Sequence, residues 1–428
     1  MPTLLNLGLS RRAVLQLGAA GAAVLLVPGP IRRRAGAQVA SPHFLVVFEA
    51  DGGWDPTQVF DVHDPNDATD GIDVDNPGQP PSVITTMGGL TYVSNPVTRP
   101  AVDAFFTTWA SRTAVVNGVN TRSTSHDQSR QLVLTGYLDP TRADFAVMSA
   151  HHSGADLPLP HLLVSGASFA GPYAGLSGRL GGAMFEAVEY DSVGDDQRAF
   201  SGLGEAYIQQ ALEFERLADA NAPSGLVTGR LAEFYDGNVR GDTLAQLATS
   251  VNVGSNDPAQ LATTLGQAFR NGLTTSVTVG RFGGFDTHDD NTEQNLRFQN
   301  VFTFLNGFLT ALAAEPAAGQ AGSLLDQTTI VVCSEFGRTP RLNSDLGKDH
   351  HPWNSYLLIG KRVRGGVTVG RTDGNQKGVK VSFSTGQPDD TGQIIDVVNV
   401  VAGIMTLVGA NASEYMPGVP PFTGFIGA

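Results

Sequence analysis

Phe44-Leu45-Val46-Val47-Phe48 is a continuous apolar run, and Glu49-Ala50-Asp51-Gly52-Gly53-Trp54-Asp55 follows it directly. A short apolar run of this kind, without polar alternation, is typical of a strand buried on both faces of a mostly parallel sheet. The acidic, glycine-rich segment then begins at the carboxyl end of that strand, which is the edge of such a sheet where ligands bind. This stretch therefore indicates both the fold class and the edge of the sheet that carries the site.

The same alternation of strand and helix continues along the chain. Further strands are predicted at short apolar runs, over residues 113–116, 161–164, 274–279, 329–333 and 356–359. Helical spacing of apolar residues predicts helices over 102–111, 127–134, 206–217, 259–269, 291–314 and 394–407. This order indicates an α/β fold with a mostly parallel central sheet and helices on both faces. We expect a single domain over 38–428 with a helical insertion at about 204–270, although the length alone would allow two domains.

Residues 1–37 are predicted to be a leader. Ser10-Arg11-Arg12 precedes an apolar stretch, and Ala35-Gly36-Ala37 supplies the small-x-small site that a signal peptidase needs. The basic residues 32–34 disfavour the general secretory channel, which favours export by the twin-arginine translocase. The alternative is an uncleaved membrane anchor, but a membrane span needs about 20 strongly apolar residues. We therefore expect a periplasmic or extracellular protein with no stable membrane span after cleavage.

Composition limits the classes of partner. The chain carries 41 acidic and 27 basic residues, a net charge of −14, and five of the arginines lie in the predicted leader. This balance disfavours nucleic acid and anionic membrane surfaces, and it is compatible with bound cations. The single cysteine, Cys333, excludes an internal disulfide. Because Cys333 ends an apolar strand run, we expect a small buried core residue rather than a nucleophile.

Acids and imidazoles recur at the ends of the predicted strands. Clusters follow the runs that end at Phe48, Val279 and Cys333, and another stands just before the strand at Tyr356. Carboxylates and imidazoles that meet at one edge of a sheet form the ligand set of a divalent ion, zinc or manganese by ligand type, with one or two ions. The predicted ligands are Asp51, Asp55, Asp286, His288, Glu335, Asp349, His350 and His351.

Each of these clusters also has a structural alternative. Asp51 and Asp55 could shape a glycine turn, and Glu335 could form a salt bridge with Arg338. The segment 349–351 could be a solvated loop. Asp286 and His288 lie two residues apart, so in an extended segment their side chains face the same side. It is the joint occurrence of these residues that favours a metal site.

A hydroxyl-rich turn precedes the helix predicted at 127–134. Ser123, Thr124 and Ser125 could cap that helix, as Ser and Thr commonly do. Alternatively, one of the three hydroxyls is a nucleophile at the helix N-terminus, where free N–H groups also bind anions. His126 would then bind a metal or orient the hydroxyl. The sequence leaves the choice among the three hydroxyls open.

Several of these motifs resemble those of a family of twin-arginine-exported bacterial proteins known as domain of unknown function 1501. The motifs are Gly283-Gly284-Phe285-Asp286-Thr287-His288, the segment 334–341 and Asp349-His350, with Ser125-His126 and Thr135-Gly136 as weaker markers. That family is grouped with the alkaline phosphatase and sulfatase superfamily. The resemblance implies an alkaline phosphatase/sulfatase-like fold in which two metals flank a Ser or Thr nucleophile.

The resemblance also implies roles for individual residues. Asp51 would match the carboxylate after the first strand, Asp286 and His288 the Asp and His after a middle strand, and His350 the late His. Glu335 would stand where the superfamily usually has Asp. The chain departs from the pattern at Phe336, where the superfamily commonly has a metal-binding His, and the Gly-Gly-x-Asp spacing makes Asp55 a rival to Asp51.

These observations predict a metal-dependent hydrolase of phosphate or sulfate esters, with a small-molecule or polysaccharide ester as substrate. A hydroxyl of the turn 123–125 would attack, and Arg338 would stabilise charge on the transferring group. The alternative is a non-catalytic, metal-containing secreted binding protein with a degenerate hydrolase site. A redox enzyme has little support, since no GxGxxG follows a strand and no cysteine cluster is present.

Overall fold

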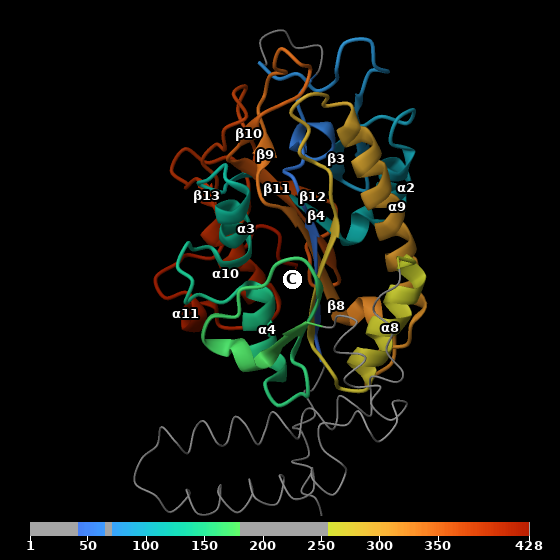
Figure 1. Ribbon diagram of the computed structural model, residues 1–428, viewed down its shortest axis with the longest axis vertical. Coiled ribbons are helices and arrows are strands. Elements are labelled where there is room, and N and C mark those ends of the chain that lie inside the picture. The colour runs from blue at the N-terminus through green and yellow to red at the C-terminus, as the bar shows by residue number, and fades with distance from the viewer. Residues whose placement is uncertain (1–41, 65–70, 180–255, 428) are drawn as a thin grey trace, which may run out of the picture. The chain divides into compact units, whose positions relative to one another are not determined.

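The computed structural model describes residues 42–64, 71–179 and 256–427. These residues form a mixed α/β structure around a nine-stranded sheet (Figure 1). The predicted leader and most of the predicted helical insertion, residues 204–255, lie outside the described residues. Among the helices that are described, none is long and apolar enough to cross a membrane.

The central sheet is mostly parallel, as predicted. Its strands run in the order β12-β4-β11-β8-β1-β7-β5-β6, and β13 also pairs with β4. At the centre, Val46 of β1 lies opposite Val277 of β7 and Ile330 of β8, in parallel register. The bounds of these parallel strands are β1 Phe44–Ala50, β4 Thr113–Asn120, β5 His161–Ser165, β6 Ser177–Arg179, β7 Ser276–Phe282, β8 Thr328–Ser334, β12 Val367–Val369 and β13 Ile395–Asp396.

One strand of the sheet runs against the others. β11 (Trp353–Gly360) is antiparallel to both of its neighbours, β4 and β8. The start of β11 therefore lies at the edge where the parallel strands end. Just before β11, the short strands β9 (Gly337–Arg338) and β10 (His350–His351) pair antiparallel, with His350 opposite Arg338. Because of this reversal, the segment that precedes β11 lies beside the segments that follow β1, β7 and β8.

Helices cover both faces of the sheet, as predicted (Figure 1). Alternate residues of β1 face opposite sides, so Phe44, Val46 and Phe48 pack in one core and Leu45 and Val47 in the other. The helices of the first core are α2 (Pro100–Trp109), α8 (Pro258–Arg270) and α9 (Glu293–Ala314). The helices of the second core are α3 (His126–Thr135), α4 (Phe145–Gly154) and α10 (Val397–Leu407), with the short α11 (Ala412–Tyr415) beside them.

The first turn of α9 connects two of the loops that follow strands. Gln294 is fully buried, and its side-chain oxygen accepts from Asp55 N at 2.9 Å. Its amide nitrogen donates to the carbonyl of Phe285 at 2.8 Å. A buried amide whose donor and acceptor are both paired fixes the groups that it contacts. The loop after β1 and the loop after β7 are thereby held together.

Some described elements were not predicted, among them a hairpin and a helix. Residues 52–96, over which no strand or helix was predicted, contain the hairpin β2 (Val83–Met87) and β3 (Leu90–Ser94). Gly88 and Gly89 join the strands with φ of 57° and 90°, and a two-residue Gly-Gly turn is a recognised hairpin signal. Helix α4 was also missed. Cys333 is 1% exposed, so the prediction of a buried core residue is confirmed, and burial raises the pKa of its thiol.

Candidate metal centre

The turn after β1 can form only because it contains two glycines. Gly52 and Gly53 have φ of 113° and 77°, which L side chains rarely adopt. A Cβ on Gly52 would lie 2.5 Å from Asp286 N, and a Cβ on Gly53 would overlap the ring of Phe336. Because neither glycine has a side chain, the loops that follow β1, β7 and β8 come into direct contact.

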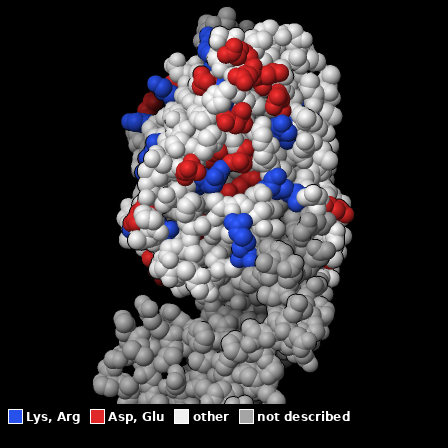
Figure 2. All heavy atoms as spheres, viewed as in Figure 1, with Lys and Arg blue, Asp and Glu red and all other residues white. Residues whose placement is uncertain are grey.

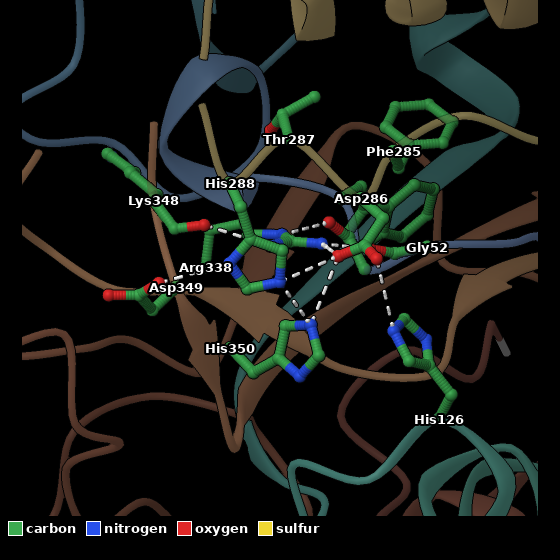
Figure 3. A network of polar contacts seen from close by, with 12 residues as sticks. Gly52, His126, Phe285, Asp286, Thr287, His288, Arg338, Lys348, Asp349 and His350 are labelled. Carbon is green, nitrogen blue, oxygen red and sulfur yellow. Dashed lines mark hydrogen bonds and ion pairs between the residues drawn. The ribbon is translucent and has the colours of Figure 1, made fainter. Parts of the chain in front are cut away.

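Asp286 lies at the centre of the polar network that these loops form (Figure 3). Its Oδ1 is 2.6 Å from Arg338 Nη2, 3.1 Å from His288 Nε2 and 3.1 Å from His350 Nε2. Its Oδ2 is 3.4 Å from His126 Nε2. Burial alone would raise the pKa of Asp286, but the hydrogen bond and positive charge of Arg338, together with the contact to His350, outweigh it and lower the pKa to about 2. Asp286 is therefore a carboxylate at neutral pH.

The three imidazoles share one arrangement of their ring nitrogens. In each, Nδ1 lies beside an oxygen that accepts: His126 beside Glu335 Oε1 at 2.8 Å, His288 beside Asp349 Oδ1 at 3.0 Å, and His350 beside the carbonyl of Thr124 at 2.8 Å. A carbonyl or ionised carboxylate has no proton to give, so each Nδ1 is the donor. In a neutral ring, Nε2 then carries a lone pair.

The three Nε2 atoms converge on the Asp286 carboxylate. His288 Nε2 and His350 Nε2 are 3.0 Å apart, and ligand atoms of His126, Asp286 and His350 all lie within 4.8 Å of one another. Lone pairs and an anionic oxygen at these separations repel one another unless a cation or protons lie between them. Imidazole nitrogen with carboxylate oxygen is the ligand chemistry of zinc and of related divalent ions. The donor set therefore fits a divalent cation.

Glu335 lies behind the ring of His126. Its Oε1 accepts from Gly52 N at 2.8 Å as well as from His126 Nδ1, and its Oε2 accepts from Ser334 Oγ at 3.0 Å. Its side chain is 2% exposed. Because Glu335 contacts Nδ1, it lies on the side of the ring away from Nε2 and Asp286. It fixes the tautomer and orientation of His126.

Arg338 is buried rather than directed to solvent. Its side chain is 0% exposed, Nε donates to the carbonyl of Gly53 and Nη1 to the carbonyl of Lys348, both at 2.8 Å. Nη2 donates to the carbonyl of Gly52 and to Asp286. In this arrangement Arg338 fixes the glycine turn and the Asp286 carboxylate, and its guanidinium is shielded from solvent. The salt bridge between Arg338 and Glu335, which was the structural alternative, is not formed: Arg338 pairs with Asp286 and Glu335 with His126.

Two predicted ligands have partners outside the imidazole cluster. Asp55 is fully buried, and its Oδ2 contacts Lys348 Nζ at 2.8 Å and Asn291 Nδ2 at 2.9 Å. His351 Nε2 lies 3.3 Å from the carbonyl of Gln376, and burial lowers the pKa of His351. The structure therefore brings together His126, Asp286, His288, Glu335, Asp349 and His350, without Asp55 and His351.

Asp51 is paired with an arginine that the sequence did not single out. The Asp51 side chain is 61% exposed, and its Oδ1 accepts from Arg130 Nη2. Arg130 lies four residues after His126 on α3, so both side chains project from the same face of that helix. This spacing on a predicted helix is the signal that could have identified Arg130.

The hydroxyl-rich turn lies directly against the imidazoles, because the Thr124 carbonyl contacts His350. Ser123 Oγ accepts from Ser125 N and donates to Gln128 Oε1, both at 3.2 Å. Thr124 and Ser125 are exposed. Ser125 occupies the N-cap position of α3, but its side chain makes no capping hydrogen bond. The capping alternative is therefore not realised at Ser125, and its hydroxyl is exposed beside His126.

Phe336 forms an apolar wall behind the imidazoles. Its side chain is fully buried, and its ring centroid lies 4.2 Å from that of His350 and 4.9 Å from that of His126. A rigid aromatic ring in contact with both imidazoles restricts their rotation.

At the surface, Figure 2 shows acidic and basic groups side by side in a hollow, with more acidic groups above it.

Comparisons with known structures give distant similarities. One is to a protein described in connection with the metabolism of multiple glycosaminoglycans by Bacteroides thetaiotaomicron, at 9% identity and a TM-score of 0.34, covering 88% of this chain and 74% of that one. Another is to Ps i-CgsB in complex with k-i-k-neocarrahexaose, at 9% identity and a TM-score of 0.34, covering 89% of this chain and 77% of that one. No curated protein matches the sequence.

A family model covers the part of the chain that carries most of the polar network. The match runs from the end of α8 through β13 to the start of α10 and includes Asp286, His288, Glu335, Asp349 and His350, whereas the turn after β1 and the start of α3 lie before it. Residues 267–397 match the family described as a protein of unknown function, DUF1501.

Proposed function

We propose that this protein is an exported, metal-dependent hydrolase of phosphate or sulfate esters, of the alkaline phosphatase/sulfatase type. One observation carries the proposal: three imidazoles commit Nδ1 to oxygen acceptors and direct Nε2 at the carboxylate of Asp286. A metal-binding histidine typically donates its other ring N–H to a carboxylate or a backbone carbonyl, and this contact fixes the tautomer.

The residues that would hold the ion are Asp286, His126, His288 and His350. Their nitrogen and oxygen donors favour zinc or manganese. Such an ion polarises an ester oxygen and lowers the pKa of a hydroxyl nucleophile. Glu335 and Asp349 would orient two of the rings, and buried Arg338 would hold Asp286 in place.

An exposed hydroxyl of the turn 123–125 would be the nucleophile. Ser125 and Thr124 are the exposed candidates, and Ser125 lies next to His126 in the chain. The hydroxyl oxygen would form a bond to the phosphorus or sulfur atom while the bond from that atom to the ester oxygen breaks. The hydroxyl proton passes to water, and the alcohol leaves with a proton from water. A second water then releases inorganic phosphate or sulfate and restores the hydroxyl.

The substrate would be a small-molecule or polysaccharide ester outside the cytoplasm, reached after export by the twin-arginine translocase. The motif at Arg11-Arg12 and the cleavage site at residues 35–37 support this location. The net charge of −14 supports the exclusion of nucleic acid as a partner.

The proposal is tested by elemental analysis of the purified protein together with a panel of aryl phosphate and aryl sulfate esters. We expect a stoichiometric divalent ion and turnover in the wild type. Asp286→Ala should lose both, because it removes the carboxylate that faces every Nε2. Asp289→Ala, in which a nearby exposed acid is removed, is the matched control and should keep both. Retention of the ion in the Asp286→Ala variant would rule out this metal site.

A second candidate is a non-catalytic, metal-containing binding protein with a degenerate hydrolase site. The observation that favours it is the contact between Arg338 Nη2 and Asp286 Oδ1 at 2.6 Å, which already balances the Asp286 charge. A bound ion without turnover of any ester in the panel would support this candidate over the hydrolase.

A further inference from the structure

We infer that the site takes a single divalent ion, and that the guanidinium of Arg130 supplies the second positive charge, facing the anionic group of the substrate. This inference rests on the proposed function, because it assumes that an ion binds at Asp286. It assigns an anion-binding role to Arg130 and a supporting role to Asp51.

The number of ions follows from the carboxylates that remain for a metal. Asp55 is fully buried against Lys348 and Asn291. Both oxygens of Glu335 accept hydrogen bonds, and one of them binds His126 on the Nδ1 side of the ring. A carboxylate on the Nδ1 side cannot bind the ion that Nε2 binds.

Asp349 stands in the same relation to His288, because it contacts Nδ1 of that ring at 3.0 Å. Asp286 is therefore the one carboxylate, among the strand-end acids named above, that faces the Nε2 atoms. One carboxylate and three imidazole nitrogens complete the coordination of one ion. A second ion would need further acidic ligands. Apart from Asp286 and Asp349, the strand-end acid with an exposed side chain is Asp51.

Asp51 is already paired with a cation. Its Oδ1 accepts from Arg130 Nη2, and Arg130 Nη1 also lies 3.9 Å from Asp127 Oδ1. Arg130 and His126 project from the same face of α3, so the guanidinium lies beside the imidazole cluster. The guanidinium of Arg130, rather than a second ion, therefore supplies the positive charge at Asp51.

Arg130 is also the cation of the site that a substrate can reach. Its side chain is 28% exposed, whereas those of Arg338 and Lys348 are 0% exposed. A planar guanidinium donates two parallel hydrogen bonds to the oxygens of a phosphate or sulfate. Asp51 orients the guanidinium from one side and leaves its remaining donors for the anion. Positively charged donors fixed in advance stabilise the charge of a transferring group.

The experiment compares metal content and anion affinity in the same proteins. The variants are Arg130→Met, Arg130→Lys and Asp51→Asn, and the matched control is Arg142→Met, a half-exposed arginine that stacks on Tyr137. Each protein is loaded with zinc and, separately, with manganese, and its metal content is measured by elemental analysis. Inorganic phosphate and inorganic sulfate are then titrated into the loaded protein by calorimetry, and circular dichroism checks the fold.

We expect one ion per chain in the wild type and in every variant, because neither Arg130 nor Asp51 is a ligand. Phosphate affinity should fall by about tenfold or more in Arg130→Met, since a charged bidentate contact is lost. Arg130→Lys should keep part of the affinity, and Arg142→Met should keep all of it. Asp51→Asn should weaken phosphate binding without loss of the ion.

Each contrary outcome has a distinct meaning. Two ions in the wild type, or loss of the ion in Asp51→Asn, would overturn the one-ion assignment. Unchanged phosphate affinity in a folded Arg130→Met variant, or no binding of either anion by the loaded wild type, would overturn the role of Arg130 and leave the metal site standing. A wild type that binds no ion would overturn the proposed function itself.

Discussion

Glu335 Oε1 accepts a hydrogen bond from His126 Nδ1 at 2.8 Å, and the same oxygen accepts from Gly52 N at 2.8 Å. One buried carboxylate oxygen thus joins the end of β8, the turn after β1 and the first residue of α3. The contact determines which ring nitrogen of His126 is free to bind a cation. It also explains how an acid directly after an apolar strand is tolerated in the core.

Replacing Glu335 with Gln should weaken metal binding without removing the site. The amide oxygen can still accept from His126 and Gly52, but the negative charge that makes Nε2 a stronger ligand is lost. Loss of such a second partner typically reduces metal affinity about 10–100-fold. Competition with a chromophoric chelator measures the change.

Glu335→Ala is the companion variant, and it should lose more affinity because no acceptor remains for either N–H. Equal metal affinity in the wild type and the Glu335→Gln variant would show that Glu335 does not act through His126. Complete loss of the ion in Glu335→Gln, with a normal fold, would instead indicate that Glu335 is itself a ligand.

Much of the sheet could be predicted because its strands are locally encoded. The runs at β1, β7 and β8 are apolar without alternation, so burial on both faces follows from the residues alone. The edge that carries the site follows from the same runs, since polar clusters stand where each run ends. The helix predicted over 127–134 is also confirmed as α3, which ends where Gly136 takes a φ of 79° as its C-cap.

The direction of β11 could not be read from its residues. Its apolar run suits either direction, yet only the antiparallel one brings His350 and Asp349 to the edge where the parallel strands end. Direction depends on which neighbours the strand pairs with, and those neighbours lie far away in the sequence. The prediction that His350 belongs with Asp286 rested on residue type, and the reversal of β11 is what makes it geometrically feasible.

The sequence also could not show which of the charged residues near the site would be buried and which would be exposed. Asp51 and Asp55 flank the same glycine pair, but Asp51 is exposed and Asp55 is fully buried against Lys348. Arg338 and Arg130 are likewise both arginines near the site, and only their burial distinguishes a positioning residue from one that meets solvent. Burial is set by tertiary packing, which a single sequence does not display.

The buried pair of Lys348 and Asp55 yields a prediction for stability. Lys348 Nζ lies 2.8 Å from Asp55 Oδ2, and both side chains are 0% exposed. Lys348→Met leaves a buried carboxylate without its cation, which typically costs about 3–5 kcal/mol of unfolding free energy. Urea unfolding of the purified protein measures the loss.

The double variant Lys348→Met/Asp55→Asn is the informative control. It removes both charges and keeps a side chain that can accept from Thr57 N, so it should be more stable than Lys348→Met alone. If the double variant is no more stable than the single one, the loss comes from packing around Lys348 and not from the uncompensated carboxylate.

Glu49 gives the protein a stability that depends on pH. It is 8% exposed at the end of β1, accepts from Ala167 N at 3.2 Å, and burial raises its pKa from an ordinary 4.5 to about 8. Between these two values the folded chain keeps a proton on Glu49 that the unfolded chain has released. The free energy of unfolding therefore falls as pH rises from about 4.5 to about 8, by an amount on the order of a few kcal/mol.

Glu49→Gln should remove this dependence, because a neutral amide still accepts from Ala167 N and has no proton to lose. Relative to the wild type, the variant should gain stability steadily as pH rises through this range, and the gain should level off above pH 8. Urea unfolding at several pH values measures it, with Glu414→Gln, at an exposed acid, as the control. A constant difference between the Glu49→Gln variant and the wild type from pH 4.5 to 8 would mean that Glu49 is already ionised in the folded chain. Arg130, which lowers the pKa of Glu49 electrostatically, would then be the first partner to examine.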